Sequence, residues 1–217
     1  MNLIDNLIQE GWLKTDLIKD AFRKIKREDF LPEGMKNLAE LNEALPIGLG
    51  QTISQPLVVA FMLELLQPKP GEKILDIGSG SGWTSALLAQ IVGGPSKAEY
   101  PGKVIAIEIV PELKEFGEKN VAKYNFIEKG IAEFVCADGS VGYPSFATRP
   151  ELAEGFDKIL ASASAKKIPE AWKKQLKING KIVTPIGNSI WLFEKKSESE
   201  FKETEYPGFV FVPLIKK

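Results

Sequence analysis

A glycine-rich turn between a short apolar run and a helical pattern is the segment of this chain best suited to bind a ligand. It spans residues 74–82 and reads ILDIGSGSG. Glycines let the backbone turn sharply and let a ligand approach the amides closely. The helix expected after the turn offers unpaired N–H groups to a carboxylate or a phosphate. The segment therefore predicts a binding loop, with expected contacts from Asp76, Gly78, Ser79, Gly80 and Gly82.

Three interpretations of this loop compete. A plain glycine turn is one, and the acid two positions before Gly78 argues against it. A dinucleotide fingerprint would place its third glycine at position 83, where the chain has Trp83. The pattern instead resembles the first motif of the class I S-adenosylmethionine-dependent methyltransferases. This resemblance implies that the loop amides face the methionyl part of S-adenosyl-L-methionine, which we expect as the methyl donor.

Acidic residues also follow the next two apolar runs. Glu108 ends one run, where a carboxylate can accept hydrogen bonds from both hydroxyls of a ribose. Asp138 and Gly139 follow the other, where the acid can receive an adenine amino group and the glycine gives room. Alone, Glu108 also fits a surface acid, and Asp-Gly also fits a common turn. Together they indicate one binding edge, because open α/β sheets bind ligands at the carboxyl ends of their strands.

The absence of histidine restricts the chemistry that the chain can perform. Histidine is the commonest general base and metal ligand, and the chain has none, with Cys136 as its single cysteine. We therefore expect no metal site and no histidine-assisted serine or cysteine nucleophile. Any chemistry must use carboxylates, hydroxyls, lysines, backbone amides or a cofactor.

Charge and hydropathy indicate a soluble globular protein. A formal net charge of −1 gives no overall attraction to nucleic acid or to an anionic membrane. Charges recur every few positions in the first thirty residues, which argues against a signal peptide, and no apolar run reaches the ~18 residues of a membrane span. We expect a cytoplasmic monomer with no nucleic-acid and no membrane partner.

Alternating patterns from residue 73 onward predict the fold class. Parallel strands are expected at residues 74–77, 104–107, 133–136 and 158–161. Helices are expected at residues 84–92, 111–124 and 169–176. Buried β-rich runs joined by amphipathic helices predict a doubly wound, mostly parallel Rossmann-like sheet covered on both faces. Antiparallel strands are expected at its edge, at residues 181–184, 190–195 and 209–215, with the charge-rich residues 194–205 as a solvated turn.

The N-terminal quarter has a different pattern. Apolar stripes predict short helices at residues 3–8 and 17–25, the second capped by Thr15. Residues 30–50 are expected as an irregular connection with a lid role, before a helix at residues 57–66. We therefore divide the chain into a helical extension with a lid loop, residues 1–56, and an S-adenosylmethionine-binding methyltransferase domain, residues 57–217, in one compact unit.

Two hydroxyls, of Thr52 and Ser54, stand just before the helix expected at residues 57–66. From composition alone, either could cap that helix. Residues 50–56, however, read GQTISQP, a string similar to the signature of the protein-L-isoaspartate O-methyltransferases. REDFLP upstream and FVPL near the C-terminus resemble other regions of that family. The resemblance covers roughly residues 20–217.

This resemblance implies methyl transfer to the free carboxylate of L-isoaspartyl residues in damaged proteins and peptides, a protein-repair reaction. Such a carboxylate is already ionised at neutral pH, so it needs no general base, and catalysis can rest on alignment. The family's matching serine implies that Ser54 binds and orients the substrate carboxylate as the catalytic residue. Thr52 and Ile53 would line the cofactor cleft, and Val212 and Pro213 the substrate side.

Two other functions share the same cofactor motifs. One is a class I methyltransferase acting on a small molecule or RNA, against which only the residue 50–56 string and the C-terminal resemblance argue. The other is a non-catalytic module that binds S-adenosylmethionine. Its main support is the sequence SAS at residues 162–164, where the family has a Thr-Ala-Ala type of sequence. Transfer to an isoaspartyl peptide would distinguish the three.

Overall fold

The computed structural model describes residues 2–94, 102–144, 146–152 and 154–215. The sequence also indicates an inserted loop at residues 94–101, and most of it lies outside these ranges. None of the helices in the described residues is long and apolar enough to cross a membrane.

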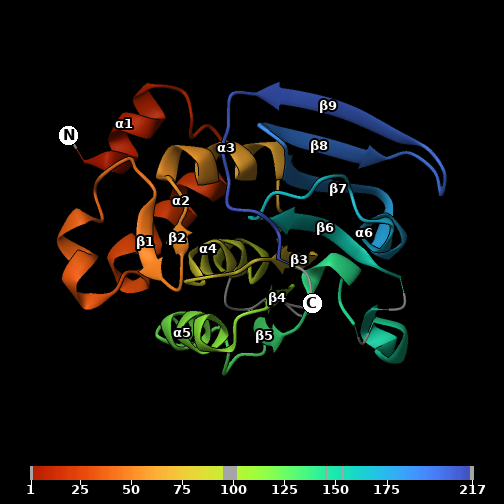
Figure 1. The fold of residues 1–217 in the computed structure, drawn as a ribbon, viewed down its shortest axis with the longest axis horizontal. Helices are drawn as coiled ribbons and strands as arrows, with labels where there is room; N and C mark the ends of the chain where they lie inside the picture. Colours follow the sequence, from red (N-terminus) through yellow and green to blue (C-terminus); the bar gives the residue numbers. More distant parts are fainter. Residues whose placement is uncertain (1, 95–101, 145, 153, 216–217) are drawn as a thin grey trace.

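A seven-stranded sheet forms the centre of the molecule (Figure 1). Its strands are β3 (Lys73–Ile77), β4 (Lys103–Glu108), β5 (Ala132–Cys136), β6 (Phe156–Ala161), β7 (Leu176–Ile186), β8 (Ser189–Lys195) and β9 (Phe201–Pro207). They are ordered β5-β4-β3-β6-β7-β8-β9. Neighbours from β5 to β7 pair in parallel, whereas β8 and β9 add in antiparallel fashion. The predicted mostly parallel sheet with antiparallel C-terminal strands is therefore confirmed.

Helices cover both faces of this sheet. They are α1 (Leu3–Gln9), α2 (Asp16–Lys24), α3 (Pro56–Leu66), α4 (Trp83–Val92), α5 (Pro111–Ala122) and α6 (Glu170–Gln175). Successive residues of a strand point to opposite faces. Accordingly, Ile74 of β3 enters the core that holds buried residues of α1 to α5, and Leu75 enters the core that holds Trp172 of α6. The N-terminal helices thus share a core with the sheet.

The connection over residues 30–50 is more ordered than its sequence suggests. The 3₁₀ helix η1 (Arg27–Phe30) leads into it, and it contains a second 3₁₀ helix, η2 (Glu33–Leu38), and the strand β1 (Leu45–Gly48). β1 forms an antiparallel hairpin with β2 (Gln51–Ile53), which follows directly. Leu49 and Gly50, at the tip of the hairpin, both have positive φ angles. A two-residue turn with this backbone matches the right-handed twist of the strands. The hairpin leads directly into α3.

Two expectations near the C-terminus are wrong. Residues 194–205 are not simply a turn, because β9 begins at Phe201 and pairs along its length with β8. Its charged side chains suit an edge strand, where charge discourages pairing with another chain. Residues 209–215 form no strand and make one isolated parallel bridge, between Ser164 and Pro213. They cross from β9 toward the end of the chain, beside β3 and β4 (Figure 1).

Short 3₁₀ helices complete the face of the sheet that carries α6. These are η3 (Gly139–Val141), η4 (Phe146–Thr148) and η5 (Pro150–Leu152). Leu152 and Tyr143 pack into the same core as Trp172 of α6. The face that carries α6 is therefore covered mainly by irregular turns rather than by long helices.

Candidate active site

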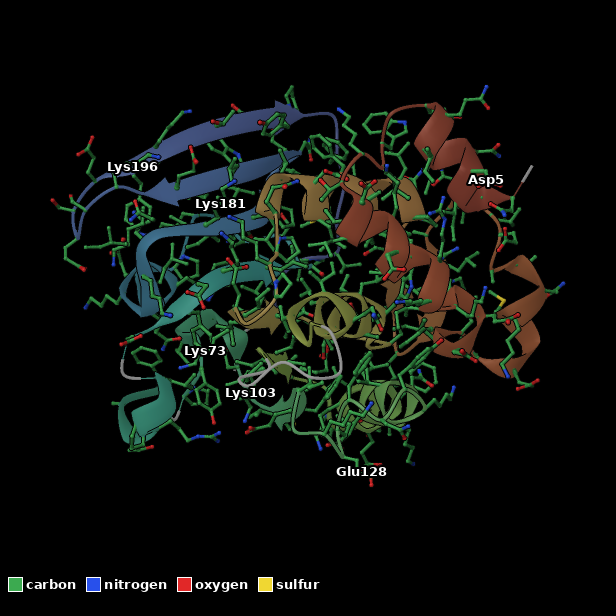
Figure 2. All side chains as sticks on the ribbon, turned by 180° about the vertical axis from the view of Figure 1, so that it is seen from behind. Asp5, Lys73, Lys103, Glu128, Lys181 and Lys196 are labelled. Atoms are coloured by element: carbon green, nitrogen blue, oxygen red, sulfur yellow. The ribbon has the colours of Figure 1, made fainter. Side chains whose placement is uncertain are left out.

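A cavity of about 360 Å³ lies at the carboxyl ends of four neighbouring strands. Gly78 follows β3, Glu108 ends β4, Ala137 follows β5 and Ser162 follows β6, and all four residues line it. Lys73 and Lys103, which begin β3 and β4, lie side by side at the opposite end of the sheet (Figure 2). The volume suits a small-molecule ligand, and the position is where open α/β sheets bind one.

The glycine loop forms one wall of the cavity. The amides of Gly78 and Ser79 donate to the carbonyl of Ile107, at 2.8 and 3.1 Å, which ties the loop to β4. Gly78, Ser79 and Gly80 line the cavity, as predicted for a binding loop. Gly82 is placed differently: it does not line the cavity and lies against α5. A Cβ atom at Gly82 would stand 2.7 Å from the carbonyl oxygen of Gly117, and its φ of +84° favours glycine.

Glu108 is held by backbone amides at the end of β4. Its Oε2 accepts from the Gly80 amide at 2.9 Å, and its Oε1 accepts from the amides of Ile109 and Val110 at 2.8 and 3.1 Å. The residue is 6% exposed and lines the cavity. A carboxylate has about four acceptor sites. Glu108 is therefore an oriented acceptor, with capacity for one more hydrogen bond, rather than a surface acid.

Asp76 lies beneath the loop, fully buried, and does not line the cavity. Its Oδ2 accepts from the hydroxyls of Ser85 at 2.6 Å and Thr84 at 3.1 Å. Burial raises its pKa to about 6, although these two hydrogen bonds act in the opposite direction. Asp76 was predicted to contact a ligand, but it lies below the cavity, where the first turn of α4 donates two hydroxyls to its Oδ2. Its Oδ1 is buried without a hydrogen-bond partner among the described residues. Asp76 supports the loop from below.

Asp138 and Gly139 follow β5 at the far end of the cavity. Gly139 lines the cavity, and a Cβ atom there would stand 2.5 Å from Cγ2 of Ile77. Asp138 lies between two lining residues, Ala137 and Gly139, and its Oδ1 accepts from the amide of Ser140 at 2.8 Å. The room that Gly139 provides is thus used by Ile77 at the end of β3, two strands away in the sheet.

The hairpin and the start of α3 form the opposite wall. Thr52, Ile53 and Ser54 all line the cavity, as the resemblance implies. The alternative interpretation of Thr52 and Ser54 as helix caps is wrong. The N-cap of α3 is Gln55, and the amide of Leu57 donates instead to Oδ1 of Asn42, at 3.0 Å. Within the described residues, the half-buried hydroxyl of Ser54 has no hydrogen-bond partner, so it is available to a ligand.

The C-terminal segment closes the third side. Val212 and Pro213 line the cavity, and so do their neighbours from Val210 to Ile215. Ser164 holds this segment through its backbone. Its amide donates to the carbonyl of Val212, and its carbonyl accepts from the amide of Leu214, both at 2.8 Å. The unusual sequence at residues 162–164 therefore supports the cavity wall through main-chain atoms, which a change of side chain preserves.

Buried polar atoms around the loop indicate a polar ligand. Within the described residues, the hydroxyl of Ser79 and the indole nitrogen of Trp83 are buried without a hydrogen-bond partner. Buried polar groups are normally paired, and both residues line the cavity. Together with the loop and Glu108, they fit a ligand that carries a carboxylate and a ribose. No group of three His, Cys, Asp or Glu side chains in the described ranges could hold a metal ion.

Several lining residues were not anticipated from the sequence. Trp83 opens α4, Ile109 and Val110 follow β4, and Ala137 follows β5. All of them come directly after a strand or the glycine loop. The rule that ligands bind at the carboxyl ends of strands could have identified them, but their apolar side chains carried no chemical signal of their own.

Comparisons with known proteins agree with this geometry. The family model for protein-L-isoaspartate(D-aspartate) O-methyltransferase matches residues 1–217. The chain belongs to this family. The protein-L-isoaspartate O-methyltransferase of Methanopyrus kandleri is 37% identical to it over 98% of the chain and 89% of the relative. That of Thermococcus sibiricus is 37% identical over 99% of the chain and 92% of the relative.

Solved structures of the same family share the whole architecture. A protein-L-isoaspartate O-methyltransferase from Plasmodium falciparum, in complex with S-adenosyl-L-homocysteine, has a TM-score of 0.85 and 25% identity, with full coverage of both chains. A second protein-L-isoaspartate O-methyltransferase structure has a TM-score of 0.82 and 26% identity, over 97% of this chain and 64% of that one. The N-terminal extension and the C-terminal strands are thus part of the family fold, together with the central sheet.

Proposed function

We propose that this protein transfers the methyl group of S-adenosyl-L-methionine to the free carboxylate of L-isoaspartyl residues in damaged proteins and peptides. The observation that carries the proposal is that one cavity joins the glycine loop and Glu108 to the segment that bears Ser54. Membership of the isoaspartyl methyltransferase family supports the same reaction.

The cofactor would be held along the strand ends. The backbone of Gly78, Ser79 and Gly80 would face its methionyl part, and Glu108, whose carboxylate already accepts three backbone amides, would accept one further hydrogen bond from a ribose hydroxyl. Asp138 and Gly139 would lie at its adenine, and Thr52 and Ile53 would cover it. We propose that Asp76 and Gly82 act indirectly, by supporting the loop and by allowing α5 to approach. When bound, the cofactor supplies an activated methyl group on a sulfonium.

The chain's own residues would then orient the acceptor. The hydroxyl of Ser54 would donate a hydrogen bond to one oxygen of the substrate carboxylate and so aim the other oxygen at the methyl group. Val212 and Pro213 would form the apolar wall beside the peptide. An isoaspartyl carboxylate is ionised at neutral pH, so no residue needs to remove a proton. This agrees with a chain that has no histidine.

A paired peptide assay tests this reaction. Two peptides identical except for isoaspartate or aspartate at one position are incubated with the protein and labelled S-adenosyl-L-methionine. We expect methyl esters on the isoaspartyl peptide and background incorporation on the aspartyl one. Binding of the cofactor by calorimetry without transfer to isoaspartyl peptides would refute the proposal and favour a binding module. Transfer to a small molecule or RNA alone would favour the other methyltransferase function.

Replacement of Ser54 by alanine tests how the site works. A hydrogen bond to a charged group contributes ~1.5–3 kcal/mol, so turnover of the isoaspartyl peptide should fall by roughly ten- to a hundredfold. Cofactor affinity should not change, because the Ser54 hydroxyl faces the acceptor. Ser199→Ala, in the exposed turn between β8 and β9, is the matched control and should keep full turnover. Unchanged turnover in Ser54→Ala would assign the orientation of the carboxylate to another group.

We further propose that the protein acts as a cytoplasmic monomer without a nucleic-acid partner, with residues 1–56 as the lid-bearing extension of a single unit. Its net charge of −1 and its single cysteine support this setting. Light scattering at assay concentration measures the oligomeric state directly. A mass of two chains would contradict the monomer.

A further inference from the structure

Arg27 is a buried cation outside the cavity wall. It begins η1 and is 6% exposed. Burial lowers the pKa of its guanidinium to about 10, with a small opposing effect of Glu40, so the side chain stays charged at neutral pH. No carboxylate of the described residues forms an ion pair with it. A buried charge is costly unless hydrogen bonds compensate it. The hydrogen bonds that the guanidinium makes therefore identify the segments that Arg27 joins.

Four backbone carbonyls surround the guanidinium. Nη1 donates to Ala39 O at 3.1 Å and Leu41 O at 2.8 Å, and Nη2 donates to Glu43 O at 2.7 Å and Ser54 O at 3.2 Å. The fixed fork of an arginine bridges carbonyls that are 15 residues apart in the chain. Residues 39–43 are thereby fastened to the segment that ends the hairpin.

A second set of contacts reinforces the same junction. Asn42 lies within the fastened stretch, and its carbonyl accepts from the Gln55 side chain at 2.9 Å. Its own side chain accepts from the amide of Leu57 at 3.0 Å. The carbonyl of Ser54 is therefore held by Arg27, and the nearby residues Gln55 and Leu57 are held by Asn42. The fork of Arg27 and the amide of Asn42 together fix the backbone on which the Ser54 hydroxyl is mounted.

The guanidinium also contacts the cofactor side of the cavity. Its central carbon lies 5.3 Å from the centroid of the Trp83 ring. Trp83 lines the cavity and opens α4, directly after the glycine loop. Phe22 of α2 also packs edge-on against the Trp83 ring, with ring centroids 5.6 Å apart, and α2 lies against α4. Arg27 therefore connects the wall that bears Ser54 to the wall formed by the glycine loop.

We propose that Arg27 is a positioning residue that holds Ser54 at a fixed place relative to the cofactor loop. The inference rests on the proposed function of Ser54 and deepens it. Reacting groups must be aligned closely, and a displacement of ~1 Å can cost ~100-fold in rate. Lysine keeps the charge but carries it as a point on a flexible stem with three donors, so it cannot bind all four carbonyls as the fork does.

Arg27→Lys is the variant that tests this. Two controls accompany it: Arg23→Lys, the same exchange at an exposed position of α2, and Ile182→Ala, a core truncation in β7 that lowers stability on the other face of the sheet. We expect Arg27→Lys to lower kcat for the isoaspartyl peptide at least tenfold while the Kd of S-adenosyl-L-methionine stays within twofold. Arg23→Lys should keep the parent kcat. Ile182→Ala should lower the unfolding temperature, but at assay temperatures where it is still folded its kcat should equal that of the parent.

A double-mutant cycle distinguishes positioning from general stability. If Arg27 acts through Ser54, Arg27→Lys should cause little further loss of kcat in a Ser54→Ala background, because residues that act on one interaction are not additive. Full additivity of the two losses would overturn the proposal. So would an Arg27→Lys variant that loses no more kcat than Ile182→Ala at equal unfolding temperature.

A second readout does not depend on the reaction. Amide hydrogen exchange over residues 42–55 should accelerate in Arg27→Lys, whereas exchange over residues 73–82 stays as in the parent. Parent-like exchange over residues 42–55 would overturn the proposal even if the enzyme is active. If the parent itself methylates no isoaspartyl peptide, the proposed function fails, and the exchange experiment still decides whether Arg27 fixes the Ser54 segment.

Discussion

Replacing Asp76 with asparagine isolates the free-energy cost of burying one carboxylate under the glycine loop. Burial raises the pKa of Asp76 from 3.8 to about 6, against the hydrogen bonds from Ser85 and Thr84. The folded state therefore binds this proton more tightly than the unfolded state. A rise of about two in pKa corresponds to roughly 3 kcal/mol. Protonated Asp76 therefore stabilises the folded state relative to ionised Asp76. This contribution is fully present below about pH 4 and is lost as the pH rises through about 6.

Asparagine has nearly the same shape, can accept the same two hydroxyl hydrogen bonds and does not ionise. The difference in unfolding free energy between Asp76→Asn and the parent should therefore shift by roughly 2.5 kcal/mol in favour of the variant between pH 4 and pH 7. Urea denaturation of both proteins without cofactor, followed at several pH values, measures this difference. All other titrating groups are common to both chains and cancel.

Glu133→Gln supplies a control of opposite sign. Burial alone would raise the pKa of Glu133, but hydrogen bonds from Arg149 and Lys103 outweigh it, and the pKa is lowered. The unfolding free energy of Glu133→Gln should therefore fall relative to that of the parent as the pH rises, because only the parent gains the stabilising ionised carboxylate. If the difference for Asp76→Asn changes by less than ~1 kcal/mol over the same range, less than one pKa unit, the carboxylate is not desolvated as described.

The remaining predictions concern single positions around the cavity. Gly82→Ala should lower the unfolding free energy by about 1–3 kcal/mol in urea denaturation, because its Cβ would meet the carbonyl of Gly117 and its φ is positive. Gly34→Ala, with open space around it, is the control. Equal stability of the two variants would refute the reasoning. Asn42→Ala should lower stability by about 1 kcal/mol, because it leaves the Leu57 amide at the start of α3 without its acceptor; a change near zero would mean that water replaces it.

Local sequence patterns determined most of the sheet. The runs that became β3, β4 and β6 are buried on both faces, so their apolar side chains identified them directly. The edge strand β5 alternates between buried and partly exposed residues, and this alternation is also typical of a strand. The sequence also placed the glycine loop and Glu108 at one edge of the sheet, because the carboxyl ends of parallel strands meet there. In the structure Gly78, Ser79, Gly80 and Glu108 line the cavity at that edge.

Edges and irregular segments could not be predicted in the same way. β9 pairs only with β8 and exposes much of its surface, so its charged sequence carries no apolar alternation, and its pairing decided that it is a strand. The sequence of residues 209–215 is that of a strand, yet in the structure this segment bridges to Ser164 and closes the cavity. Which neighbour a segment meets is a tertiary fact that its composition does not record.

The sequence by itself determined that this chain has a glycine-rich loop after an apolar run, acids at the ends of expected strands, hydroxyls at Thr52 and Ser54, and no histidine. Only the tertiary structure decided that Asp76 lies below the loop, that Gly82 faces α5, and that Arg27 fastens the carbonyl of Ser54. The physical reason is that each property depends on which atoms the fold brings together: Asp76 meets the hydroxyls of Ser85 and Thr84, whereas Gly82 and Arg27 meet backbone carbonyls. A backbone carbonyl is the same in every residue, so a side chain that binds one leaves no complementary residue type in the sequence.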